Sequence, residues 1–274
     1  MILVRTTDLA EPVLELADHL RKASGMPAVM LVDERGGSVG SSRHPKLSLD
    51  RDSYAALRLH TPADVGWRCG DYGFYLAREA YPKVERFWMI ESDVRLVGAA
   101  DRFFATTEAH AGLDLLAARL RPAEPDWWWR PHVAAADARP WRCFFPVVRL
   151  SARAVDLLYA KRREHSRCLS RVALWPNDES FVATAVANSP LRRADLNALG
   201  SRFYDDATFS YENVIDGDEV RPDQSGPPRL LHPVLSGPAY RRKVEKVSAF
   251  GRPDPWSLRV RRALARRVNA RRAW

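Results

Sequence analysis

Two carboxylates spaced one residue apart, Glu91 and Asp93, follow directly on the apolar run Phe87-Trp88-Met89-Ile90. Hard divalent cations such as Mg²⁺ and Mn²⁺ prefer oxygen ligands, and substrate phosphates often complete their coordination. Unpaired carboxylates are costly to bury beside such a run, which favours an open cleft. The alternative is that the two carboxylates cap a strand and form ion pairs with Arg86 or Arg95.

A second acidic group, Asn177-Asp178-Glu179, stands where a helical pattern begins. Its ordinary explanation is helix capping, because acidic side chains in a first turn interact favourably with the helix dipole.

The elements that must position these residues begin with a β-α-β pattern. Residues 2–5 form a mostly apolar, strand-like run, residues 11–23 carry apolar side chains at helical spacing, and residues 28–32 form a second apolar run before Asp33. Such units build parallel sheets, and ligand-binding groups gather at the carboxyl ends of their strands. Thr6 and Asp33 fall at two such ends.

Further along, residues 34–53 are rich in Gly, Ser and charge and are predicted to form a surface loop. A helix is predicted over 71–81 and a third buried strand over 86–90. The leucine spacing in 111–120 predicts another helix. A strand is expected over 144–150, with Arg149 in a surface ion pair or at the site's edge, followed by a helix capped by Ser151.

Several segments together resemble one enzyme superfamily. The β-α-β start, then Cys69-Gly70-Asp71-Tyr72 opening a helix, then Trp88-Met89-Ile90-Glu91-Ser92-Asp93-Val94-Arg95 resemble a GT-A glycosyltransferase over roughly residues 1–235. Glu91-Ser92-Asp93 stands where that superfamily carries its Asp-x-Asp motif, with Glu in the first position. The resemblance implies an α/β fold with a Rossmann-like, mostly parallel sheet sandwiched by helices in a single domain.

The same resemblance implies roles for individual residues. Glu91, Asp93 and the late His232 would hold Mn²⁺ or Mg²⁺, with Asp93 the more direct ligand. Asp178 or Glu179 would act as the general base of an inverting transfer. Thr6, Asp33 and Asp71 would join Glu91 and Asp93 in contacting the nucleotide-sugar donor, and Trp127, Trp128 and Trp129 would stack on acceptor sugars or pack as core.

The chain carries 43 Lys and Arg against 34 Asp and Glu, a net charge of +9, so it should be attracted to something anionic. Seven of the arginines lie between 259 and 272, interleaved with apolar residues. This divides the chain into a GT-A-like catalytic domain, 1–247, and a basic amphipathic helical tail, 248–274, that would rest on an anionic membrane or a partner. We expect no membrane span and no signal peptide, hence a cytoplasmic protein, which the basic tail could bring to the inner face of the plasma membrane as a peripheral protein.

The expected activity is transfer of a sugar from a nucleotide-sugar donor to a glycan or glycolipid acceptor, in bacterial surface polysaccharide or lipopolysaccharide synthesis. Two alternatives stay open: a Mg²⁺-dependent nucleotidyl or phosphoryl transferase, and a basic membrane- or nucleic-acid-binding protein. The sequence has no phosphate-loop or Gly-x-Gly-x-x-Gly motif, which counts against P-loop and Rossmann cofactor chemistry. It also has no recognisable nucleic-acid-binding module, so nucleic acid is not an expected partner.

Overall fold

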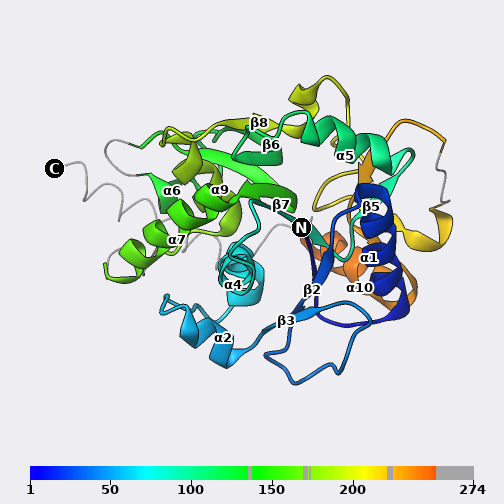
Figure 1. Cartoon of the computed structure of the whole chain (residues 1–274), viewed down its shortest axis with the longest axis horizontal. Coiled ribbons are helices and arrows are strands. Elements are labelled where there is room, and N and C mark those ends of the chain that lie inside the picture. The colour runs from blue at the N-terminus through cyan, green and yellow to red at the C-terminus, as the bar shows by residue number, and fades with distance from the viewer. Residues whose placement is uncertain (135–137, 169–171, 173, 221–224, 251–274) are drawn as a thin grey trace.

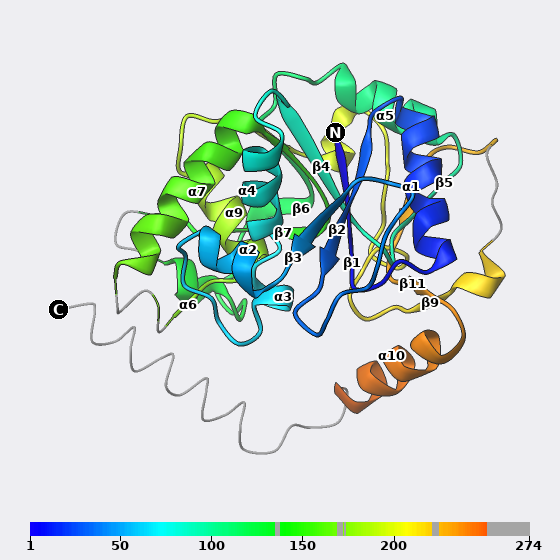
Figure 2. The ribbon, with the colours of Figure 1, turned by 60° about the horizontal axis from the view of Figure 1, so that its bottom comes forward.

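A single seven-stranded sheet organises the chain, with helices on both of its faces (Figures 1 and 2). The structure, a computed structural model, describes residues 1–134, 138–168, 172, 174–220 and 225–250. The sheet strands are β1 (Ile2–Thr6), β2 (Ala28–Asp33), β3 (Lys46–Leu49), β4 (Arg86–Glu91), β6 (Leu115–Pro122), β7 (Trp141–Ser151) and β8 (Arg193–Asp195).

The strand order is β3-β2-β1-β4-β7-β6-β8. All neighbouring pairs are parallel except the two that involve β7, which runs antiparallel to β4 and to β6. The expected α/β class with a mostly parallel sheet between helices is therefore confirmed.

Helices cover both sides of this sheet. They are α1 (Glu11–Ser24), α2 (Arg51–Ala56), α3 (Val65–Arg68), α4 (Tyr72–Ala80), α5 (Ala100–Glu108), α6 (Arg130–Val133), α7 (Ala152–Ser166), α9 (Asp178–Ala187) and α10 (Gly237–Phe250), with short 3₁₀ turns η1 (Leu196–Leu199) and η2 (Gly217–Glu219). No helix among the described residues has the length and apolar character needed to cross a bilayer.

The core has two halves because side chains alternate across each strand. In β1, Ile2 and Val4 pack against α1 and α5, whereas Leu3 packs on the opposite face against α4. In β4, Trp88 faces the α1 and α5 side and Met89 faces the α4 side. Both faces of the central strands are buried, which explains their nearly continuous apolar sequences.

Most of the predicted elements are confirmed. The β-α-β start corresponds to β1, α1 and β2, the helix predicted over 71–81 is α4, and the strand predicted over 86–90 is β4. The strand predicted over 144–150 is the centre of β7. Ser151 caps the following helix, its hydroxyl oxygen accepting the Ala154 backbone N–H at 3.2 Å.

Two local predictions are wrong. Leu115, Leu116 and Leu120 lie in β6, which is paired on both sides by β7 and β8, so this apolar segment forms a buried strand rather than a helix. Within 34–53, predicted to be a loop, the chain forms β3 and the start of α2, which is capped by Asp50.

Two short ribbons lie outside the main sheet and bring the late part of the chain to its edge. The strand β5 (Arg95–Val97) pairs antiparallel with β10 (Arg229–Leu231), and β11 (Val234–Leu235) pairs with β9 (Ile215–Asp216). The Val234 N–H also donates to the Asp93 carbonyl at 2.7 Å. Residue 232 is thereby fixed next to the turn that follows β4.

The basic tail falls mostly outside the described residues, which end at 250. The boundary expected after residue 247 lies inside α10, and Figure 2 shows this helix beside β9 and β11.

Candidate functional site

The carboxylates of Glu91 and Asp93 meet the imidazole of His232 at the carboxyl edge of the sheet. One ligand atom from each side chain lies within 4.8 Å of the others. His232 Nε2 is 3.4 Å from Asp93 Oδ1 and 3.8 Å from Glu91 Oε2. The structure thus brings together the three side chains predicted to form a metal site, hereafter the Glu91–Asp93–His232 cluster.

The imidazole of His232 is held in a defined orientation. Its Nδ1 lies 2.8 Å from the Ser210 carbonyl oxygen, which can only accept a hydrogen bond. Nδ1 therefore carries a proton, and in the neutral ring the lone pair of Nε2 faces the carboxylates. The rings of Phe144 and Phe209 pack on the imidazole at 5.3 and 5.7 Å.

Charge in the cluster is balanced internally. Burial opposes protonation of His232, but the hydrogen bond and charge of Asp93 outweigh it and raise the pKa of the imidazole. Burial acts to raise the pKa of Asp93, yet the neighbouring His232 holds it below its ordinary value. The charged forms of His232 and Asp93 thus stabilise each other.

Arg5 orients Glu91 from the neighbouring strand. Its Nη1 is 2.8 Å from Glu91 Oε1, and its Nη2 donates to the Gly66 carbonyl. Burial works against the charged form of Arg5, but the charges of Glu91 and Asp178 raise its pKa. One oxygen of Glu91 is therefore committed to Arg5, and the other faces His232.

Asp178 lies in the wall of the site, where its carboxylate is almost fully buried. Asp178 Oδ2 accepts the Gly70 N–H at 2.9 Å and Oδ1 accepts the Glu179 N–H at 2.8 Å. Burial raises its pKa well above the usual range, and the nearby Arg5 opposes that shift. These contacts tie the Asp178 carboxylate to the backbone at Gly70 and Glu179.

Glu179 is the more accessible of the two carboxylates, being half-buried. Burial raises its pKa to about 7, the charge of Glu91 adds to this, and Arg142 opposes it. The helix cap is Asn177, whose Oδ1 accepts the Ser180 N–H at 3.1 Å, so capping does not account for Glu179. A carboxyl with a pKa near 7 can accept a proton at neutral pH.

Gly70 leaves room for the contact between Arg5 and Asp178. A Cβ on Gly70 would lie 2.6 Å from Arg5 Nη1 and 2.6 Å from Asp178 Oδ2. We expect Gly70→Ala to displace both side chains and to lower the free energy of unfolding by about 1–3 kcal/mol. Urea denaturation measures this, with Gly36→Ala as control because a Cβ there meets nothing within 4 Å. Equal stability of the two variants would contradict the close packing at Gly70.

The two residues predicted at the ends of β1 and β2 have local partners. The Thr6 hydroxyl is buried and donates to the Asp8 carbonyl at 2.9 Å, which holds the turn after β1. Asp33 accepts two hydrogen bonds from Arg35, at 2.8 and 2.6 Å. Burial would raise the pKa of Asp33, but Arg35 holds it below its ordinary value. Asp33 retains partial exposure at the edge of the sheet, next to Arg5.

Asp71 requires a correction. Instead of facing a ligand, it lies fully buried in the core, where Arg162 donates to both of its oxygens at 2.8 and 3.0 Å. The Tyr75 hydroxyl donates to it at 2.6 Å. A carboxylate so enclosed and so fully bonded cannot reach a nucleotide, so its role is structural.

Two basic residues near the acidic side chains were not among the predicted site residues. Arg142 in β7 interacts with Glu179, and Lys243 in α10 interacts with Asp93 and Glu91. The Lys243 Nζ lies 4.0 Å from the centre of the Tyr211 ring. Neither residue belongs to a motif, and only the fold brings them to the acidic residues.

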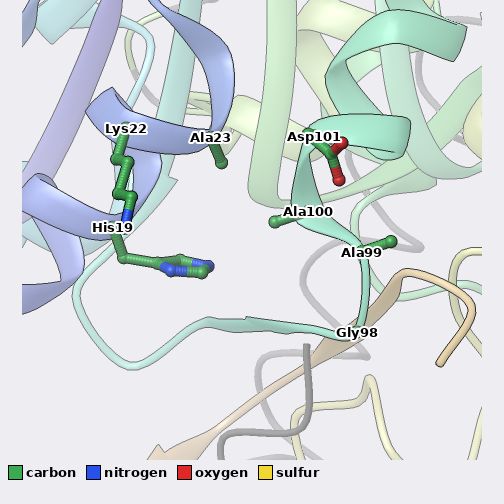
Figure 3. Close-up of a pocket in the computed structure, with 7 residues that line it drawn as sticks. All are labelled: His19, Lys22, Ala23, Gly98, Ala99, Ala100 and Asp101. Carbon is green, nitrogen blue, oxygen red and sulfur yellow. The ribbon is translucent and has the colours of Figure 1, made fainter. Parts of the chain in front are cut away.

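A separate cavity of about 310 Å³ lies between α1 and the start of α5. Figure 3 shows His19 and Lys22 on one side of it and Asp101 on the other. None of its lining residues belongs to the Glu91–Asp93–His232 cluster.

Comparisons with known proteins show similarity to solved structures. No protein-family profile matches the chain, and no curated protein matches it. Among solved structures, a glycosyltransferase involved in the glycosylation of the major capsid of PBCV-1 aligns with a TM-score of 0.38 and 10% identity. The alignment covers 90% of this chain and 98% of that one. A similarity at this level says nothing about activity, and the geometry of the cluster is what bears on function.

Proposed function

We propose that the chain is a nucleotide-sugar glycosyltransferase that transfers a sugar to a glycan or glycolipid acceptor. The observation that carries the proposal is the convergence of Glu91, Asp93 and His232, with Glu179 close enough to interact with Glu91. A cation-binding cluster next to a carboxyl that titrates near pH 7 is the pairing that such a transfer needs.

The donor atoms of the cluster suit a divalent cation. Two carboxylate oxygens and one imidazole nitrogen, all within 4.8 Å of one another, are atoms that a divalent cation takes as ligands. We propose Mn²⁺ or Mg²⁺, held by Glu91, Asp93 and His232. When bound, such an ion would neutralise charge on the diphosphate of a donor.

The protein's own residues account for the remaining steps. Glu179 takes the proton of the acceptor hydroxyl while that oxygen forms a bond to the anomeric carbon of the donor. The bond from the anomeric carbon to the diphosphate breaks, and its electron pair leaves with the diphosphate. Attack opposite the leaving group inverts the anomeric configuration. Arg5 and Asp178 keep Glu91 and the wall of the site in place.

The setting belongs to the proposal as well. A glycan or glycolipid acceptor fits polysaccharide or lipopolysaccharide synthesis at the cytoplasmic face of a bacterial membrane. The basic residues of 251–274, which lie outside the described part of the chain, would provide attraction to anionic lipid.

Calorimetry and thermal unfolding test the proposal directly, using UDP-, GDP-, CMP- and dTDP-sugars with and without Mn²⁺ or Mg²⁺. We expect one nucleotide class to stabilise the protein only with the metal, because a ligand that binds the folded state raises its stability. Asp93→Asn and His232→Gln should each weaken this metal-dependent binding by roughly tenfold or more. The control Asp101→Asn, an acidic residue of the separate cavity, should bind as the wild type does.

Two outcomes would reject the proposal. Metal-dependent binding of nucleoside triphosphates with pyrophosphate release would favour the nucleotidyl transferase. Binding of anionic lipid or nucleic acid without any response to nucleotide-sugars would favour the basic binding protein.

A further inference from the structure

Two tryptophans from distant parts of the sequence meet at the surface beside the site. The ring centres of Trp67, in α3, and Trp129, at the start of α6, are 5.9 Å apart with an angle of 45° between the rings. Trp67 is 57% exposed, more than any other large hydrophobic residue in the described ranges. An aromatic side chain this exposed marks a binding surface when it lies at a functional site.

Arg68 and His132 hold the Trp129 ring in place. The Arg68 guanidinium lies 5.4 Å from the centre of the Trp129 ring, and it is fixed by Asp64 and by the Trp175 carbonyl. His132 packs on Trp129 at 4.8 Å. Burial lowers the pKa of His132 to about 4, so the ring is neutral at pH 7.

The segment that carries Trp67 is joined to the site by its backbone. The Gly66 carbonyl accepts a hydrogen bond from Arg5, the residue that pairs with Glu91. Arg68 bonds to the Trp175 carbonyl, three residues before Asp178. The tryptophan pair is therefore anchored to both the cation-binding side and the Glu179 side.

A similar arrangement links the segment before α6 to Glu179. Arg142 lies 4.8 Å from the centre of the Trp127 ring, and its charge acts on Glu179. Figure 2 shows α3 between α6 and α10 in the lower part of the molecule. Arg142 thus links Trp127, two residues before Trp129, to the predicted base.

We propose that Trp67 and Trp129 form a platform for a pyranose ring of the acceptor, so that the acceptor is a glycan rather than a bare lipid or protein hydroxyl. This inference rests on the proposed function and names its acceptor class. The axial C–H groups of a pyranose present an apolar face to an aromatic ring, and its hydroxyls can bond to charged groups at the rim.

The charges around the platform favour a neutral ligand. Arg68 is paired with Asp64 at 2.8 Å, and Arg142 is paired with Glu124 at 3.1 Å. Paired charges leave little attraction for an anionic membrane, whereas they still offer hydrogen-bond partners to sugar hydroxyls.

Saturation-transfer NMR with a panel of methyl glycosides and short neutral oligosaccharides tests the platform on the full chain. We expect transfer to ring C–H protons of at least one glycoside from the wild-type protein. Trp67→Ala and Trp129→Ala should each weaken that binding about tenfold. Trp67→Phe should retain most of it. The control Val244→Ala removes an exposed apolar side chain from α10 and should have no effect.

The test separates this inference from the proposed function. If the tryptophan variants keep metal-dependent donor binding but lose glycoside binding, both proposals stand. If donor binding fails in the wild type while glycosides still bind through Trp67, the glycosyltransferase is rejected, and the tryptophan pair remains a pyranose-binding surface without a role as acceptor site. If no glycoside of the panel binds, or if Trp67→Ala and Trp129→Ala bind as the wild type does, the platform is rejected.

Discussion

Replacing Glu179 with Gln is expected to lower kcat by about 10²–10⁴, because the amide cannot take the proton of the acceptor hydroxyl. Gln keeps the size of the side chain and an oxygen that can accept the contact from Asn177, now 3.3 Å long. Donor binding, measured by calorimetry, should therefore stay close to the wild-type value. Radiolabelled or mass-spectrometric product formation measures the loss of turnover.

The pH dependence of the transfer rate is a second test of Glu179 as the base. Since the base must be deprotonated and the pKa of Glu179 is raised to about 7, the wild-type rate should fall with decreasing pH below that value. The limiting slope is about tenfold per pH unit. Glu179→Gln should lose this slope. A variant that keeps both the rate and the pH profile would remove Glu179 from the mechanism.

Removing the carboxylate of Asp71 is expected to lower the free energy of unfolding by about 3–5 kcal/mol, because it leaves a buried charge without its partner. Arg162 and Asp71 are both fully buried, and the guanidinium lies 3.8 Å from the centre of the Phe181 ring and 4.9 Å from that of Trp175. Asp71→Ala would strand that guanidinium among rings. Urea denaturation followed by circular dichroism measures the loss.

Two further variants serve as controls for Asp71→Ala. Asp156→Ala removes a carboxylate that pairs with Arg78 at 3.0 Å on the surface, and it should cost less than about 1 kcal/mol. The double variant Asp71→Leu with Arg162→Leu should be more stable than Asp71→Ala, because no charge is left unpaired. Similar losses for Asp71→Ala and Asp156→Ala would show that the buried pair carries no special cost.

The sequence predicts the amino-terminal half of the fold well, for a physical reason. In β1, α1, β2 and β4 the apolar runs, the helical spacing and the following polar residues all agree. The prediction fails in the segment 111–120, because its leucine spacing fits both a helix and a strand that is buried on both faces. The segment is a strand because it pairs with β7 and β8.

The site shows the same division between local and long-range information. Glu91 and Asp93 are recognisable because they end an apolar strand, which is a local signal. Arg142 and Lys243 carry no such signal, and Arg149, expected at the surface, is fully buried and donates to the carbonyls of Thr107 and His110. The prediction that Asp71 contacts the donor is wrong because the sequence pattern of an acidic residue at the start of a helix is the same whether its side chain faces solvent or a buried arginine such as Arg162.

The pairing of β10 with β5 has a consequence for the order of events during synthesis. Glu91 and Asp93 leave the ribosome well before His232, which needs β10 in place to reach them. At about 5–20 residues per second, the nascent chain would spend roughly ten seconds or more with its two carboxylates exposed and the imidazole still missing. Capture of the proposed divalent ion would therefore wait for His232, and ribosome-bound chains stalled before residue 232 should lack it.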